Sequence, residues 1–206
     1  MKFDRLEYWK NPSAPGFPRE LRLDGRPEFY LLLDGITDLV VKTLSKYLKH
    51  DQTILELGSG TGRNLAGLKR AGFENVSGIE LNEHAVALGL EHFPELADVP
   101  VKIGAIENLI KRATKVDCIF TQGLLQHIPP ELDWIFGTIA KKATALIMTI
   151  ENEQAFGQRS WARDYKSVFE ELGWVQIEER SNTGLRGHVP STVVRVFEKR
   201  IDATRE

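Results

Sequence analysis

The feature that most constrains the fold is a turn with three glycines, Gly58, Gly60 and Gly62, placed between two apolar patterns of different period. The run TILEL at 53–57 predicts a buried strand, and the residues from Arg63 onward predict a helix. Glycine suits this turn because the backbone must reach positive φ and a ligand must approach it without a Cβ in the way. The stretch therefore predicts a strand, a ligand-binding turn and a helix.

Short apolar runs and helical patterns alternate along the rest of the chain. Runs such as ILEL, CIF and ALIMTI are apolar throughout, which is typical of parallel strands covered on both faces. This pattern predicts an α/β, Rossmann-like, mostly parallel sheet with helices on both faces. The expected strands are 53–57, 76–80, 99–103, 116–121 and 145–150, and the expected helices are 28–49, 63–71, 83–92, 107–113, 130–142 and 161–172.

The end of the chain breaks this alternation. Two further strands are expected at 175–179 and 192–198, and the segment between them is too short for a helix that packs back on the sheet. Strands joined in this way pair antiparallel. The sequence therefore predicts seven strands, of which the last two form a C-terminal antiparallel hairpin.

Length and composition limit the organisation and the partners. At 206 residues the chain suits one core, so we expect a single domain at 29–206 preceded by an arm or lid at 1–28, which is rich in proline and glycine. The formal charge of −2 provides no basic field for nucleic acid. No apolar run is long enough to cross a bilayer, so we expect a cytoplasmic protein without a membrane partner. The single cysteine, Cys118, excludes a cysteine-based zinc cluster, no metal site is expected, and the oligomeric state stays open.

Two acidic residues flank the glycine turn. Glu80 ends the second expected strand, where a carboxylate can accept both hydroxyls of a ribose. This geometry is shared by sites for NAD and sites for S-adenosylmethionine (SAM). Glu56 immediately precedes the turn and would repel the pyrophosphate of a dinucleotide. A carboxylate there suits an ammonium group instead.

The order acidic residue, apolar residue and GxGxG stands here as Glu56-Leu57-Gly58-Ser59-Gly60-Thr61-Gly62, and it resembles the first motif of class I S-adenosylmethionine (SAM)-dependent methyltransferases. The resemblance runs from Asp51 to Arg200 and implies SAM as the cofactor. It also implies that the backbone of the loop holds the methionine part, that Glu80 holds the ribose and that Leu81 packs on adenine. The antiparallel hairpin distinguishes the sheet of this family from that of a plain dinucleotide fold.

A second motif of the family follows the third strand and often reads GDAEN, with an aspartate that bonds the adenine amino group. This chain has Gly104-Ala105-Ile106-Glu107-Asn108, so Ala105 occupies the aspartate position. The resemblance still implies a backbone N–H from Ile106 to the adenine ring. Glu107 or Asn108 takes the amino group, or else these two side chains only cap a helix.

The segment after the fourth strand is expected at the ligand-binding edge of the sheet. The resemblance implies that Thr121 and Gln122 run beside the methionine part of SAM. His127 is the candidate general base, because imidazole can take a proton near neutral pH, and its alternative is a structural histidine that bonds a carbonyl. Residues 120–130, FTQGLLQHIPP, are also similar to a string in small methylases linked to pseudaminic acid type sugar biosynthesis.

Candidate acceptor residues come from two other segments. After the fifth strand, Glu151, Arg159 and Tyr165 are candidates to orient a polar or acidic acceptor, and packing is the alternative for each. In the arm, Tyr8 and Trp9 belong either to a lid over the site or to a structural brace. The loop 182–190, with its arginine and histidine, is expected to reach the same opening.

These observations favour a SAM-dependent methyltransferase that modifies an O or N nucleophile of a small polar or sugar-like metabolite. Methyl transfer from a sulfonium needs alignment and exclusion of water more than a catalytic constellation, which fits the absence of a nucleophile triad. The alternatives are a protein methyltransferase, a nucleotide-dependent oxidoreductase and a non-catalytic SAM-binding protein.

Overall fold

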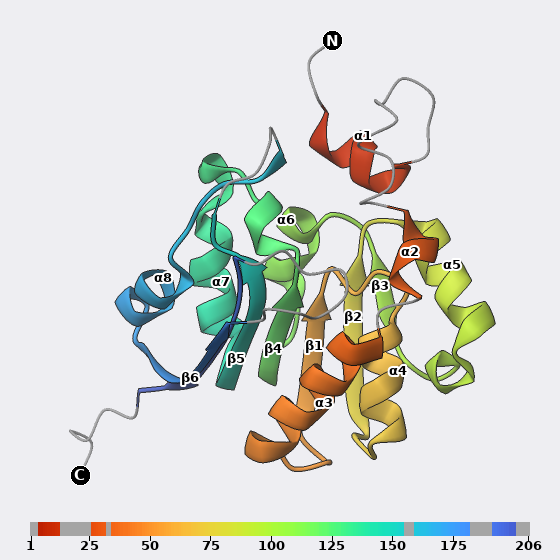
Figure 1. The fold of residues 1–206 in the computed structure, drawn as a ribbon, viewed down its shortest axis with the longest axis horizontal. Helices are drawn as coiled ribbons and strands as arrows, with labels where there is room; N and C mark the ends of the chain where they lie inside the picture. The colour runs from red at the N-terminus through yellow and green to blue at the C-terminus, as the bar shows by residue number, and fades with distance from the viewer. Residues whose placement is uncertain (1–3, 13–25, 32–33, 155–158, 182–190, 201–206) are drawn as a thin grey trace.

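The computed structural model describes residues 4–12, 26–31, 34–154, 159–181 and 191–200. Its centre is one seven-stranded sheet with the strand order β3-β2-β1-β4-β5-β7-β6 (Figure 1). Strands β1 to β5 are parallel, and β7 pairs antiparallel with both β5 and β6. The predicted mostly parallel sheet with a C-terminal hairpin is confirmed. The strands are β1 (Thr53–Leu57), β2 (Asn75–Glu80), β3 (Val101–Ile103), β4 (Val116–Gln122), β5 (Ala143–Asn152), β6 (Trp174–Ser181) and β7 (Thr192–Lys199).

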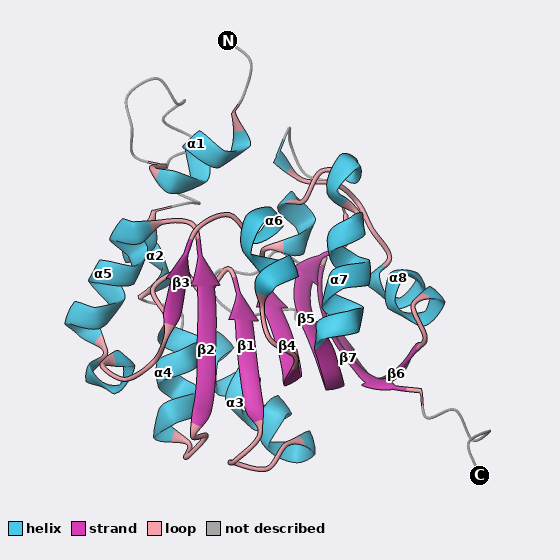
Figure 2. Cartoon of the chain, turned by 180° about the vertical axis from the view of Figure 1, so that it is seen from behind, coloured by secondary structure: helices cyan, strands magenta, loops and turns pink. Residues whose placement is uncertain are grey.

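Helices cover both faces of the sheet, as the apolar strands require. One apolar cluster joins α3 and α4 to the sheet, and another joins α7 and α8 to its opposite face (Figure 2). The α-helices are α1 (Arg5–Lys10), α2 (Pro27–Tyr30), α3 (Asp34–Tyr47), α4 (Arg63–Arg70), α5 (Glu83–His92), α6 (Ile106–Leu109), α7 (Trp134–Lys142) and α8 (Tyr165–Glu171). None of the helices in these described ranges is long and apolar enough to cross a membrane.

Several predicted boundaries are wrong, each for a local reason. The continuous helix expected at 28–49 is two helices, and the N–H of Leu31, the residue that caps α2, bonds the carbonyl of Phe29. Strand β3 begins two residues later than expected because Val99 donates its N–H back to Leu96 and closes a 3₁₀ turn. Helix α8 begins at Tyr165 rather than four residues earlier, since Asp164 caps it through a bond from Lys166.

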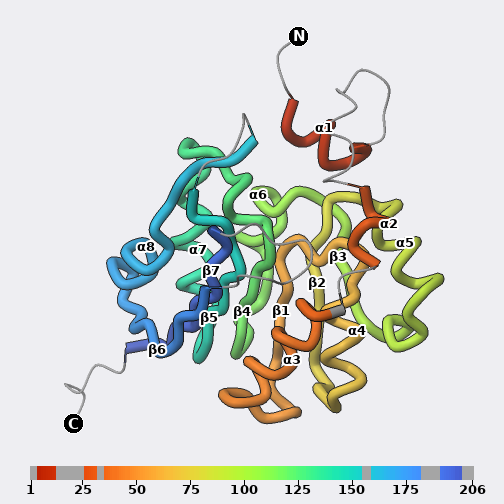
Figure 3. The backbone as a smooth tube through the Cα atoms, in the orientation of Figure 1, coloured from red at the N-terminus to blue at the C-terminus, as the bar shows by residue number. Residues whose placement is uncertain are grey.

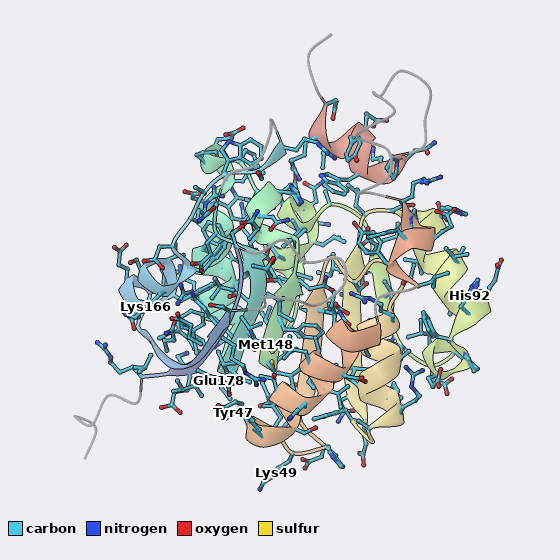
Figure 4. The ribbon with its side chains drawn as sticks, viewed as in Figure 1. Tyr47, Lys49, His92, Met148, Lys166 and Glu178 are labelled. Atoms are coloured by element: carbon cyan, nitrogen blue, oxygen red, sulfur yellow. The ribbon has the colours of Figure 1, made fainter. Side chains whose placement is uncertain are left out.

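Two features position the rest of the chain around the sheet. Helix α1, which begins after the capping residue Asp4, lies above the carboxyl ends of the strands (Figure 2). At the opposite end, Tyr47 of α3 donates a 2.7 Å hydrogen bond to Glu178 of β6, and these two residues are neighbours in Figure 4. Helix α3 is thereby fixed across the sheet, whose last strands β5, β7 and β6 can be followed in Figure 3.

Candidate functional site

A cavity of about 480 Å³ opens at the carboxyl ends of β1, β2 and β4, between the glycine turn and α1. Open parallel sheets bind their ligands at this edge. The sequence-predicted residues that line the cavity are Trp9, Glu56, Gly58, Ser59, Gly60, Glu80, Leu81, Ala105, Ile106, Gln122, His127 and Arg159. The fold thus brings together candidates from six separate stretches of the chain.

The three glycines of the turn have different reasons to be glycine. All have positive φ, at 70° for Gly58, 55° for Gly60 and 71° for Gly62, as the turn chemistry predicted. A Cβ on Gly60 would meet no atom within 4 Å, so it would project into open space beside the cavity. A Cβ on Gly62 would lie 2.8 Å from Leu96, and Gly62 caps α4 without lining the cavity. Gly60 therefore leaves room for a ligand, whereas Gly62 permits packing.

A fourth glycine, which the sequence reasoning missed, supports the turn from α5. A Cβ on Gly89 would lie 1.9 Å from the carbonyl oxygen of Thr61. Because that oxygen belongs to the backbone of the turn, it cannot move aside as a side chain can. Gly89 is thus needed for α5 to pack directly against the glycine turn.

Glu56 presents an unusual carboxylate to the cavity. The side chain is buried, and its Oε1 accepts a 2.7 Å hydrogen bond from Nδ2 of Asn64. Its Oε2 is also buried but has no hydrogen-bond partner within the described residues. Burial raises the pKa of Glu56 to about 8, although the bond from Asn64 and the charge of Arg63 oppose the shift. Such a carboxylate can accept a hydrogen bond from a cationic group, or from another donor, of a ligand.

Arg63 is a buried cation beside Glu56, and the sequence reasoning did not identify it. Its guanidinium lines the cavity and donates a 2.6 Å hydrogen bond to Oε1 of Gln122. A cation in the first turn of a helix opposes the helix dipole. The position of Arg63 in the sequence, directly after the glycine turn and at the start of α4, could therefore have identified it as a candidate site residue. Glu56 and Arg63 together place an acidic group and a cation at one end of the cavity.

The acidic residue at the end of β2 is held by backbone N–H groups. One oxygen of Glu80 accepts from Gly60 at 2.7 Å, and the other accepts from Leu81 and Asn82, each at 2.8 Å. Burial raises its pKa, and these three bonds oppose the shift. The bonds fix the carboxylate at the rim of the glycine turn, and of its roughly four acceptor positions they leave one, on the oxygen that accepts from Gly60, for a further donor.

The turn after β3 places Glu107 at the same end of the cavity as Ala105 and Ile106. One oxygen of Glu107 forms an ion pair with Arg5 of α1. Its Oε2 is buried and has no hydrogen-bond partner in the described part of the chain. Asn108, the alternative named from the sequence, does not line the cavity.

Thr121 and Glu151 lie behind the cavity rather than in its lining. The Thr121 hydroxyl donates a 2.8 Å hydrogen bond to Oε1 of Glu151, which also accepts from the N–H of Leu124. Oε2 of Glu151 accepts from the N–H of Gln126 at 3.3 Å. Burial raises the pKa of Glu151 to about 7. The carboxyl group therefore holds the turn after β4 from behind the lining of the cavity.

His127 lines the cavity, and neighbouring groups engage both of its ring nitrogens. Nδ1 lies 2.5 Å from the carbonyl oxygen of Arg159, and because a carbonyl only accepts, Nδ1 carries the proton. Oε1 of Gln126 accepts from the N–H of Asn152, so its amide nitrogen donates to Nε2 of His127 at 3.1 Å. Burial, together with the charges of Arg159 and Arg5, lowers the pKa of His127 to about 4, although the hydrogen bond to the carbonyl of Arg159 opposes the shift. This arrangement fits the structural alternative, a histidine bonded to a carbonyl.

The other acceptor candidates are divided by the fold. Trp9 and Arg159 line the cavity, and the guanidinium of Arg159 lies over the ring of Tyr8 at 4.7 Å. Tyr8 itself, a residue of α1, is buried and does not line the cavity. Tyr165 is buried in the core against Phe136, so the packing alternative describes its position. The loop 182–190 lies outside the described residues.

Comparisons with known proteins agree with this geometry. The family model for a methyltransferase domain matches residues 29–183. No curated protein matches the sequence.

Solved structures share the fold at low sequence identity. The magnesium protoporphyrin IX methyltransferase ChlM from Synechocystis PCC 6803, with bound SAH, has a TM-score of 0.67 at 14% identity, covering 95% of this chain and 100% of that one. An O-methyltransferase family protein from Burkholderia thailandensis has a TM-score of 0.70 at 11% identity, covering 98% and 64%. The [4+2]-cyclase SpnF also aligns, with a TM-score of 0.66 at 14% identity, covering 82% and 81%. One fold therefore serves several reactions, and the site must decide between them.

Proposed function

The chain belongs to the methyltransferase domain family, and from this we propose that it transfers the methyl group of SAM to an O or N nucleophile of a small polar or sugar-like metabolite. The observation that carries the proposal is the buried Oε2 of Glu56, which has no hydrogen-bond partner among the described residues and lies near the charge of Arg63. The amino-acid end of SAM is a zwitterion, whose ammonium group fits Glu56 and whose carboxylate fits Arg63. SAM bound there supplies a methyl group on a sulfonium, which is already activated for transfer.

The adenosine end of the cofactor is assigned to the other acidic residues. Glu80 is positioned to accept the ribose hydroxyls, and the N–H of Ile106 is offered to the adenine ring. Glu107 takes the role of the aspartate whose position Ala105 occupies, because its Oε2, which has no partner among the described residues, is an acceptor for the adenine amino group. Arg5 holds the other oxygen of Glu107, so α1 takes part in shaping the adenine site.

The acceptor is assigned to the part of the cavity below α1, which is lined by Trp9, Gln126, His127, Asn152 and Arg159. These side chains offer an aromatic face, amides and one cation, which supports a small polar acceptor over an apolar one. His127 is proposed as a positioning residue, since its ring nitrogens are already engaged. The contribution of this region is to align the nucleophile and to exclude water.

Isothermal titration with SAM and with S-adenosylhomocysteine (SAH) tests the foundation of the proposal. Both are expected to bind the purified protein, and NAD(H) is expected to give no protection in a thermal melt. Undetectable binding of SAM and SAH would sink the proposal. Protection by NAD(H) alone would favour the oxidoreductase alternative. Transfer of a radiolabelled methyl group to the small-molecule fraction of a lysate, and not to its proteins, distinguishes a metabolite acceptor from a protein acceptor.

A further inference from the structure

A buried hydroxyl on α3 contacts the polar groups behind the glycine turn. Thr37 is 7% exposed, and its Oγ1 donates a 3.0 Å hydrogen bond to Oδ1 of Asn64 on α4. The two helices approach closely at this point because Gly67 has no side chain, and a Cβ there would lie 2.2 Å from Cγ2 of Thr37. Thr37 is thus held against Asn64 by the packing of one helix on the other.

This hydroxyl supplies the donor for the amide oxygen of Asn64, while the amide nitrogen faces two acceptors. The two orientations of an asparagine amide have nearly the same shape, so the hydrogen-bond partners select between them. With Oδ1 accepting from Thr37, Nδ2 faces Oε1 of Glu56 at 2.7 Å and Oε1 of Gln122 at 3.2 Å. The reversed amide would place an oxygen against both of these oxygens, in a buried region where the repulsion is poorly screened.

Asn64 is linked to both Glu56 and Arg63 at this end of the cavity, to Glu56 directly and to Arg63 through Gln122. By holding Oε1 of Glu56, Asn64 leaves Oε2 as the oxygen without a partner among the described residues. By donating to Oε1 of Gln122, it shares that acceptor with Arg63, whose bond to the same oxygen is 2.6 Å long. One amide therefore connects the carboxylate and the guanidinium.

We propose that Thr37 is a positioning residue for cofactor binding, which orients Asn64 and through it the Glu56 carboxylate and the Gln122–Arg63 pair. The inference rests on the proposed placement of the amino-acid end of SAM between Glu56 and Arg63. It adds that α3, an element that does not line the cavity, positions the polar residues at this end of the site. The adenosine end does not depend on Thr37.

Titration of Thr37→Val with two ligands tests the proposal. SAH carries the amino-acid end, whereas 5′-methylthioadenosine keeps the adenosine and the thioether but lacks that end. Valine keeps the shape of threonine but cannot donate, so the amide oxygen of Asn64 loses its partner and Asn64 is held less firmly beside Glu56 and Gln122. We expect SAH to bind about tenfold more weakly and 5′-methylthioadenosine to bind within about twofold of the wild type. Thr37→Ser, which keeps the hydroxyl, is expected to recover most of the SAH affinity.

Thr149→Val provides the matched control, because Thr149 is a buried threonine of β5 whose hydroxyl has no partner in the described ranges. It is expected to leave the affinities for both ligands unchanged. Circular dichroism checks that Thr37→Val folds. If it does not, Thr37→Ala is titrated with the same two ligands, and its affinity for SAH is compared with that of Thr37→Ser.

The outcomes separate this inference from the proposed function. Equal weakening of both ligands, or no weakening of either, would overturn the role of Thr37 while leaving the cofactor site in place. A wild-type protein that binds SAH no better than 5′-methylthioadenosine would overturn the placement at Glu56 and Arg63, and the role of Thr37 with it. Selective loss of SAH affinity that serine restores supports the inference.

Discussion

The indole of Trp9 lies against the imidazole of His127, with ring centroids 4.7 Å apart and planes inclined by 52°. This contact joins α1 to the turn after β4. Two further contacts hold the same helix, the ion pair of Arg5 with Glu107 and the position of Arg159 over Tyr8. Helix α1 is therefore connected to the segments that follow β3, β4 and β5, and it lines the cavity with Arg5, Leu6 and Trp9.

Trp9→Ala is expected to speed the dissociation of SAH if α1 is a lid. An aromatic pair contributes about 0.5–1.5 kcal/mol, so the rate should rise roughly two- to tenfold. Stopped-flow displacement of SAH measures this rate. Trp134→Ala is the control, because Trp134 lies at the start of α7 beneath Lys111 and does not line the cavity. An unchanged dissociation rate combined with a lower melting temperature would show that α1 is a brace.

His127 is expected to stay neutral through the physiological range, because burial lowers its pKa from 6.5 to about 4. The neutral form is favoured by folding, so its contribution to stability is present above pH 6.5 and is lost as the pH falls through 4. The NMR signal of the ring, assigned by its loss in His127→Ala, should not titrate between about pH 5.5 and 8. A titration midpoint of His127 near the ordinary value of 6.5 would contradict this prediction and favour the role of general base.

The same variant separates the two roles of His127 in the reaction. His127→Ala removes the same ring contact as Trp9→Ala, so it is expected to weaken SAH binding by no more than about tenfold and to turn over more slowly, since the turn after β4 and Trp9 both lose a partner. For a positioning residue, the pH dependence of kcat should be unchanged in shape. Wild-type turnover with the true acceptor would show that His127 has neither role.

Glu56→Gln is expected to stabilise the ligand-free protein at high pH. Burial raises the pKa of Glu56 from 4.5 to about 8, so its contribution is fully present below pH 4.5 and is lost as the pH rises through 8. Above that pH the buried carboxylate costs on the order of a few kcal/mol, which glutamine avoids. Urea unfolding of both proteins at pH 5 and at pH 9 checks the sign. A difference that does not grow with pH would contradict the assignment.

Binding of SAH at pH 7 is expected to release a proton from Glu56. The ligand-free carboxyl is mostly protonated at this pH, and an ammonium group next to it favours the ionised form. Titration calorimetry in phosphate and in Tris, which differ in ionisation enthalpy, measures the release. Glu56→Gln should abolish it, and an equal release from this variant would assign the proton to another group.

Gly60→Val and Gly89→Ala are expected to damage the site in different ways. At Gly60, φ is 55° and a Cβ meets no atom, so valine costs about 1–2 kcal/mol of backbone strain but fills the space for the ligand. At Gly89, the new Cβ would collide with the backbone of Thr61, so stability should fall more than in Gly60→Val. Melting temperatures and SAH titration distinguish the two. Retained SAH binding by Gly60→Val would argue against the ligand path along the turn.

Local patterns were sufficient to predict the order of strands and helices from residue 53 onward and the conformation of the glycine turn, whereas helix α1 was not predicted. The run 53–57 and the helix at 83–92 have the bounds that their periodicity predicted, because the apolar pattern and the capping residues act within a few positions. Boundaries failed where a hydrogen bond from a neighbouring turn ended an element, as at Val99. The cofactor followed from Glu56 and the loop, since these lie together in sequence.

The sequence alone determined the sheet, its closing hairpin and the methyl donor, since these depend on residue type at short spacing. Only the tertiary structure decided which candidates share one cavity, because packing brings Trp9, Gln122 and Arg159 together from distant segments. It also showed that Glu151 and Tyr165 lie outside the lining of the cavity and that both ring nitrogens of His127 have neighbours. The bond from Thr37 to Asn64 has no signal in the sequence, because it arises from the close contact of two helices at Gly67.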